Sequence, residues 1–169
     1  MTDNQLQWTR YNFELFGISF DIFAGSHVAI MLNPLTPNIG YLVQSRGSLV
    51  LTVSYGTDSS LESWLKRISN SGAEEVLMIQ EKQPIEFCGH PAERVVVKVV
   101  PPLPAIGHRH WRYGTENVEG GYAGPFLLTM VGTTHRQTPL VAMFQKPSLH
   151  ASSYARAEKH FFASFLCQT

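Results

Sequence analysis

The sequence predicts an α+β domain in which an antiparallel β-sheet is flanked by helices. Three observations carry this prediction: alternating apolar residues in the first third of the chain, an amphipathic helical pattern over 59–71, and a second such pattern over 153–166. Most connections between these segments are short, which favours antiparallel pairing. A chain of 169 residues is sufficient for one core, so we predict a single domain over residues 1–169.

Residues 1–56 are predicted to be β structure, because apolar side chains at alternate positions lie on one face of a sheet. The apolar residues on which this depends are Trp8, Phe13, Leu15, Ile18, Phe20 and Ile22. Gly17 interrupts the pattern, and the Pro-Asn pairs between 33 and 40 mark turns. The further strands predicted in this region are residues 27–32, 41–44 and 49–55.

The predicted helix over 59–71 begins with a capping box, in which the side chains of Ser59 and Glu62 satisfy backbone N–H groups. Its apolar residues recur with helical spacing and therefore share one face. They are Leu61, Trp64, Leu65 and Ile68. Gly72 supplies the C-terminal stop. We interpret this face as core packing, with Trp64 largely buried against the sheet.

The rest of the chain predicts more strands and the second helix. The expected strands are residues 76–79, 85–87 and 93–100, followed by a hairpin of 126–131 with 140–145. His135 and Arg136 lie at the expected hairpin tip, where we predict that both are solvated. Residues 101–125 form one long irregular segment, and a loop of this length is usually functional or disordered.

Composition excludes some classes of function. Thirteen basic and thirteen acidic residues balance, so the whole chain offers no field that would attract nucleic acid. Its apolar runs are too short to span a bilayer. The first residues lack the pattern of a secretory signal, so we expect a cytoplasmic protein. In that compartment Cys88 and Cys167 are expected to be unpaired, reduced thiols.

Three short motifs appear in a characteristic order along the chain. They are Ser60-Leu61-Glu62-Ser63-Trp64-Leu65, Gly89-His90-Pro91-Ala92-Glu93-Arg94 and Ala163-Ser164-Phe165. In this order the chain resembles the PsbP-like superfamily, which includes photosystem extrinsic proteins, a Ran-GTPase-binding factor and bacterial DcrB-type domains. The chain departs from that pattern in the segment 101–125 and in lacking a tryptophan-containing turn after the first strands.

The resemblance implies an α/β/α sandwich more than it implies a function. The superfamily is dominated by binding and assembly roles. One bacterial branch resembles chaperones that hold hydrophobic segments of type VI secretion effectors.

A candidate binding surface combines the outer face of the 93–100 strand with the segment that follows. Arginine beside aromatic residues can engage a peptide, an anion or a base. The predicted contact residues are Arg94, Val96, Lys98, Arg109, Trp111, Arg112 and Tyr113. His108 and His110 would point the same way on an extended backbone, but they lack a third ligand. We therefore predict no metal, with these two histidines as weak candidates.

Two other sequence patterns do not indicate a catalytic or phosphate-binding site. Cys88 and His90 are close enough in sequence for a nucleophilic pair, but Gly89 between them is more typical of a tight turn. Gly120, Gly121 and Gly124 are not followed by the Lys-Ser/Thr of a phosphate-binding loop. The sequence thus nominates no catalytic residue.

We predict a non-enzymatic binding or assembly module with a protein partner. Its most specific form is a chaperone or adaptor for an apolar segment of a secreted effector. We predict no cofactor, no nucleic acid and no membrane span, and leave a homodimer open. The alternative is a small-molecule or metal-binding enzyme or sensor centred on His108, His110 and Trp111.

Overall fold

The structure is a computed structural model, and it describes residues 6–32, 39–70, 75–100, 125–149 and 151–168. The elements in chain order are β1 (Trp8–Phe13), η2 (Glu14–Phe16), β2 (Ile18–Phe23), β3 (Val28–Leu32), β4 (Gly40–Arg46), β5 (Leu49–Tyr55), α1 (Leu61–Ser69), β6 (Glu75–Phe87), β7 (His90–Val100), β8 (Phe126–His135), β9 (Thr138–Pro147), η3 (Ala151–Tyr154), α2 (Ala155–Ala163) and β10 (Leu166–Cys167).

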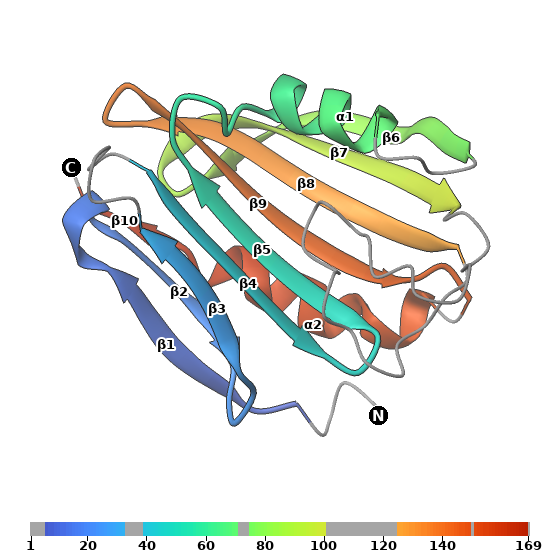
Figure 1. The fold of residues 1–169 in the computed structure, drawn as a ribbon, viewed down its shortest axis with the longest axis horizontal. Coiled ribbons are helices and arrows are strands. Elements are labelled where there is room, and N and C mark those ends of the chain that lie inside the picture. The colour runs from blue at the N-terminus through green and yellow to red at the C-terminus, as the bar shows by residue number, and fades with distance from the viewer. Residues whose placement is uncertain (1–5, 33–38, 71–74, 101–124, 150, 169) are drawn as a thin grey trace.

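A seven-stranded sheet forms the centre of the fold, with the order β3-β4-β5-β9-β8-β7-β6. Each neighbouring pair of strands runs antiparallel. Figure 1 shows α1 along one face of this sheet and α2 along the other. The predicted α+β class, an antiparallel sheet flanked by helices, is therefore confirmed.

The opening strands do not join the large sheet. β1 and β2 form a three-stranded sheet with β10, in the order β1-β2-β10. This corrects two expectations: the described residues form two sheets, and the last helix ends at Ala163 rather than at 166. The physical reason is pairing in space, because Leu166 and Cys167 lie opposite Ser19 and Ile18 of β2.

Helix α1 forms at the predicted place but begins at a different cap. Ser60 is the N-cap, and its hydroxyl oxygen accepts from the backbone N–H of Ser63 at 3.1 Å. Ser59 instead turns inward, with its hydroxyl 2.5 Å from that of Ser54. The helix buries Trp64 and Ile68 against β7, β8 and β9. The predicted core face of this helix is thus confirmed.

One continuous strand, β6, replaces the two short strands predicted between 76 and 87. It pairs with β7, and the register shifts between Leu77 and Glu81. The turn to β7 consists of Cys88 and Gly89, both with positive φ. Strand β7 therefore begins at His90, three residues before the start of the predicted strand 93–100.

The hairpin of β8 and β9 is longer than expected. His135 pairs with Thr138, so the connection is Arg136-Gln137, with φ of 50° and 64°. Positive φ at both positions is typical of a two-residue turn that matches the twist of the strands. The prediction of a solvated His135 is wrong, because only 1% of this residue is exposed.

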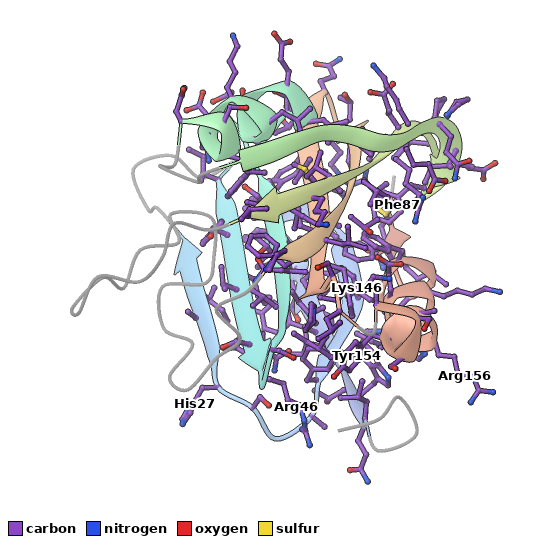
Figure 2. The ribbon with its side chains drawn as sticks, turned by 90° about the vertical axis from the view of Figure 1, so that its right-hand side faces the viewer. His27, Arg46, Phe87, Lys146, Tyr154 and Arg156 are labelled. Atoms are coloured by element: carbon purple, nitrogen blue, oxygen red, sulfur yellow. A yellow bond between two sulfur atoms is a disulfide. The ribbon has the colours of Figure 1, made fainter. Side chains whose placement is uncertain are left out.

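Helix α2 covers the opposite face of the large sheet through Ala157 and Phe161. A buried ion pair adds to this contact: Lys146 Nζ on β9 lies 3.3 Å from Glu158 Oε2, and Thr129 Oγ1 donates to the other carboxylate oxygen. Figure 2 shows Lys146 near α2 in the side-chain view. Both charged groups are thereby satisfied inside the protein.

The small sheet is attached to the large one by polar as well as apolar contacts. The buried side chain of Gln44 on β4 accepts from the N–H of Phe23 and donates to its carbonyl oxygen, each at 2.7 Å. One amide thus pairs with both backbone groups of a β2 residue. Within the described residues, no helix is both long and apolar enough to cross a membrane.

Candidate functional site

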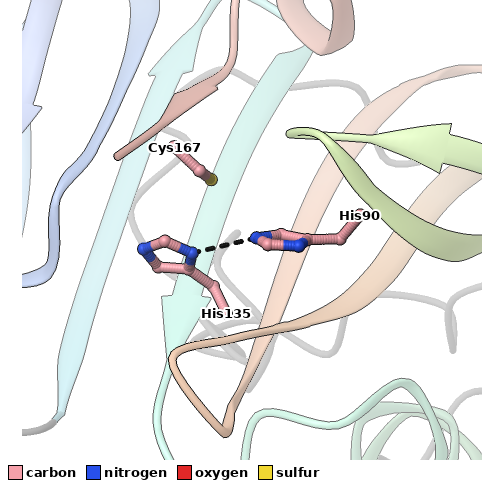
Figure 3. A group of neighbouring side chains, drawn as sticks. All are labelled: His90, His135 and Cys167. Carbon is pink, nitrogen blue, oxygen red and sulfur yellow. Dashed lines mark hydrogen bonds between the residues drawn. The ribbon is translucent and has the colours of Figure 1, made fainter. Parts of the chain in front are cut away.

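Two histidines meet where the small sheet packs on one end of the large sheet. His90 is the first residue of β7 and His135 is the last of β8. Glu93 of β7 pairs with Gly132 of β8. Three residues further along the same register, His90 lies opposite His135. Their rings lie as Figure 3 shows, with His90 Nε2 3.1 Å from His135 Nδ1.

The hydrogen bonds determine which nitrogens carry protons. His135 Nε2 lies 2.9 Å from the carbonyl oxygen of Phe16. Because a carbonyl oxygen only accepts, Nε2 of His135 must carry the proton and donate. When His135 is neutral, Nδ1 is then an acceptor and His90 Nε2–H donates to it, so the Nδ1 lone pair is directed toward His90.

The surroundings of His135 also favour its neutral form. Burial lowers the pKa of His135, and the positive fields of His90 and Arg136 lower it further. The hydrogen bond to the carbonyl of Phe16 acts in the opposite direction and raises the pKa, but burial is the larger effect. The hydroxyl of Tyr55 donates to the backbone carbonyl of His135 at 2.9 Å, which holds the end of β8 in place.

A disulfide lies beside the two imidazoles. Cys88, in the turn before His90, is bonded to Cys167 of β10, and their Cα atoms are 5.3 Å apart. The prediction of two unpaired thiols is thus wrong, because the pairing of β10 with β2 brings Cys167 to the β6–β7 turn. With its sulfur in this bond, Cys88 carries no nucleophilic thiol for a pair with His90.

The packing around Arg136 shows how closely the small sheet approaches this hairpin. A Cβ atom at Gly17 would lie 2.5 Å from Nη2 of Arg136, and φ of Gly17 is +66°. The positive φ favours glycine there, and a larger residue would also have to displace the guanidinium of Arg136. The same guanidinium donates to the carbonyl of Gln168 at 3.2 Å. The histidines and the disulfide are therefore enclosed by three separate parts of the chain.

A second feature is a cleft between α2 and the β6–β7 hairpin, which we call the α2 cleft. It encloses about 340 Å³. The side chains around it are Ile85, Glu86, Phe87, Arg94, Val131, Glu158, Lys159, Phe162 and Ala163. Its lining is mainly apolar, with charged residues of both signs. Figure 2 shows Phe87 beside the end of α2.

A larger hollow of about 790 Å³ lies beside α1. Leu61 and Leu65 supply much of its apolar lining, and long charged side chains such as Lys66 and Lys82 surround them. Lys82 is engaged with Glu93 at 3.5 Å. No aromatic side chain lines this hollow among the described residues, in contrast to the α2 cleft.

Comparison with known proteins identifies the fold. The structure is similar to that of the cyanobacterial PsbP protein, CyanoP, from Synechocystis sp. PCC 6803, with a TM-score of 0.62, 10% identity and coverage of 95% of this chain and 92% of the other. The chain has a PsbP-like fold. The Ran-binding protein Mog1p of Saccharomyces cerevisiae is also similar, with a TM-score of 0.52, 12% identity and coverage of 96% of each chain.

A Pseudomonas aeruginosa protein of unknown function, described as a putative regulator, matches with a TM-score of 0.41 and 12% identity over 90% of this chain and 92% of that one. No protein-family model matches the sequence, and no curated protein is similar enough to be matched. The PsbP-like fold that the sequence motifs predicted is confirmed at the level of three-dimensional structure.

The PsbP-like fold separates the predicted contact residues. Arg94, Val96 and Lys98 share the face of β7 that is turned toward α2. Arg94 lines the α2 cleft and forms an ion pair with Glu81 at 2.9 Å. Val96 is buried and Lys98 is half-buried.

The other sequence candidates lie outside the described residues. They are Arg109, Trp111, Arg112 and Tyr113, the weak metal candidates His108 and His110, and the glycines of 120–124.

His135 is the site residue that sequence reasoning missed. A signal for it exists in the period of the β8 strand. Residues 127, 129, 131, 133 and 135 lie on one face, and Val131 of this set is in the core. Continuing the alternation past residue 131 would have placed His135 on the core side. The polar sequence around it instead indicates a solvated turn.

Proposed function

We propose that this protein is a non-enzymatic binding module that holds an apolar segment of a partner protein in the α2 cleft. The observation that carries this proposal is the lining of the cleft. The half-buried Phe162 and Ile85 offer apolar contacts above the buried Phe87 and Val131, and Arg94 lies at the same place. Aromatic and arginine side chains surrounded by apolar area are typical of the residues that dominate binding energy.

The size of the cleft fits the insertion of apolar side chains. Its volume of about 340 Å³ is at the lower end of the range of roughly 300–1,000 Å³ for ligand pockets. Each large apolar side chain that a partner buries contributes roughly 1.5–3 kcal/mol. Two such side chains in the cleft would provide much of the affinity of a transient complex, with Glu86 and Lys159 at its exposed edge.

The fold likeness to Mog1p, a Ran-binding protein, supports a protein as the partner. In its finer form the proposal is that the chain acts as a chaperone or adaptor for an apolar segment of a secreted effector, as in type VI secretion. The contact surface would continue from Arg94 and Lys98, on either side of the buried Val96, into Arg109, Trp111, Arg112 and Tyr113.

Peptide binding tests this function directly. Overlapping peptides from the products of adjacent genes are titrated against the whole protein, and apolar peptides are expected to bind. Ile85→Glu places a charge in the cleft and should weaken binding by about tenfold or more. Leu15→Glu is the matched control, because Leu15 is 73% exposed and does not line the cleft. Equal binding by both variants, or no binding of apolar peptides, would overturn the proposal.

Folding of the variants is checked separately by thermal melting. Lys159→Glu reverses the charge of an exposed residue at the cleft, so it tests the same surface without disturbing the core. For the predicted extension of the surface, replacing Arg109 and Trp111 together by Ala should weaken peptide capture and leave the melting temperature nearly unchanged. Unaltered capture by that double variant would remove the segment from the site.

A further inference from the structure

We propose that reduction of the Cys88–Cys167 disulfide creates a zinc site whose ligands are His90, His135 and Cys167. Their ligand atoms all lie within 4.8 Å of one another. Figure 3 shows the sulfur of Cys167 directed toward the gap between the two imidazole rings. Two imidazole nitrogens and one sulfur form the mixed donor set that Zn²⁺ prefers in proteins.

The spacing of the ligand atoms is close to that of a tetrahedral zinc centre. Zn–N bonds of about 2.0–2.1 Å and a Zn–S bond of about 2.3 Å place neighbouring ligand atoms about 3.3–3.6 Å apart. His90 Nε2 and His135 Nδ1 are already 3.1 Å apart. Small rotations of the two rings and of the Cys167 side chain therefore suffice to direct all three ligand atoms at one ion.

The residues around His135 already hold it as a ligand. Its Nε2–H donates to the carbonyl of Phe16 at 2.9 Å, which leaves Nδ1 as the nitrogen with a lone pair. A metal-bound histidine ordinarily donates its other N–H to a carbonyl or carboxylate in this way. Only 1% of His135 is exposed, so little water competes for the position. The ring of His135 is thus already oriented for metal binding before any metal is present.

The disulfide determines whether the third ligand is present. A dithiol reductant transfers two electrons and two protons: its own thiols become a disulfide, the S–S bond of Cys88 and Cys167 breaks, and two cysteine thiols result. Zn²⁺ then displaces the proton from Sγ of Cys167 to solvent and binds the thiolate, while His90 takes the tautomer with its proton on Nδ1 so that Nε2 offers its lone pair. The fourth position is taken by the released Cys88 or by water.

The start of β7 and β10 would thus be connected in both redox states. In the oxidised protein a covalent bond joins the β6–β7 turn to β10. In the reduced protein the zinc ion would join β10 to the first residue of β7 and the last residue of β8. The metal would therefore replace the covalent connection that reduction removes. It would also attach the end of the β8–β9 hairpin to β10.

Zinc titration of the whole protein, monitored by competition with a chromophoric chelator, tests this site. Tris(2-carboxyethyl)phosphine replaces the dithiol in this experiment: its phosphorus is oxidised to the phosphine oxide, and water supplies the oxygen and the two thiol protons. Reduced protein should bind one Zn²⁺ about 100-fold more tightly than oxidised protein does, because only the reduced protein offers the thiolate. Cys88→Ser should bind zinc without any reductant. Cys167→Ser should lose the redox-dependent binding, and Co²⁺ bound to reduced protein should show thiolate-to-cobalt charge transfer.

Controls separate this site from other histidines. His27→Gln, at an exposed position, and His108→Gln with His110→Gln should leave the redox-dependent binding unchanged. His90→Gln, at a half-buried position, should abolish it while the fold persists. The proposal is overturned if reduced protein binds no more tightly than oxidised protein, if His90→Gln binds as well as the wild type, or if the cobalt spectrum lacks the thiolate band.

Discussion

The Cys88–Cys167 disulfide should contribute strongly to the free energy of unfolding. The perturbation is its reduction, with zinc removed by a chelator. The two cysteines are 79 residues apart in sequence. In the chain-entropy description, closing a loop of this length restricts the unfolded ensemble and stabilises the folded protein by about 4.5 kcal/mol at 25 °C.

Urea unfolding followed by tryptophan fluorescence measures this effect. We expect the reduced protein to lose about 3–5 kcal/mol and to unfold at a lower urea concentration. A double variant with serine at both cysteine positions should match the reduced wild type and should not respond to reductant. The reasoning is refuted if reduced and oxidised protein unfold at the same urea concentration.

Three further predictions concern single side chains. Trp64→Ala should lower the free energy of unfolding by about 3–5 kcal/mol, because Trp64 is 1% exposed; a loss below about 1 kcal/mol, which is typical of surface positions, would contradict its placement. Glu158→Ala leaves Lys146 buried without its carboxylate partner, so a loss of about 3–5 kcal/mol is expected in urea unfolding, and a neutral result would contradict the pairing. The lowered pKa of His135 means that the unfolded chain takes up the proton first, so oxidised, zinc-free protein should have its full stability above about pH 6.5 and lose stability as pH falls toward the folded-state pKa. His135→Gln should flatten that dependence, and an unchanged slope in urea unfolding across this pH range would count against it.

Local patterns predicted the parts of the fold that local interactions determine. The spacing of Trp64 and Ile68 identified the buried face of α1 because a helix repeats every 3.6 residues wherever it packs. Alternation identified the two faces of β7 in the same way. The cap was displaced by one residue because Ser59 and Ser60 both have a hydroxyl, and only packing beside Ser54 distinguishes them.

The candidate site depended on contacts between distant segments, so the sequence did not predict it. Cys167 reaches Cys88 only because β10 pairs with β2, and a strand of two residues has no recognisable pattern. His135 is buried because Phe16 and Tyr55 approach the end of the hairpin. Arg94 is the predicted contact residue that does line a cleft, but its ion pair with Glu81 depends on the irregular pairing of β6 with β7.

The small sheet combines early strands with a late one, and this has a consequence for synthesis on the ribosome. Two of its strands precede every other described strand, whereas β10 follows every other described element. Until residues 166 and 167 leave the exit tunnel, the β10-facing edge of β2 lacks its partner and Cys88 lacks Cys167. Non-local pairing of this kind slows folding. A nascent chain must therefore keep the apolar side of β1 and β2 from other proteins until translation has passed β10.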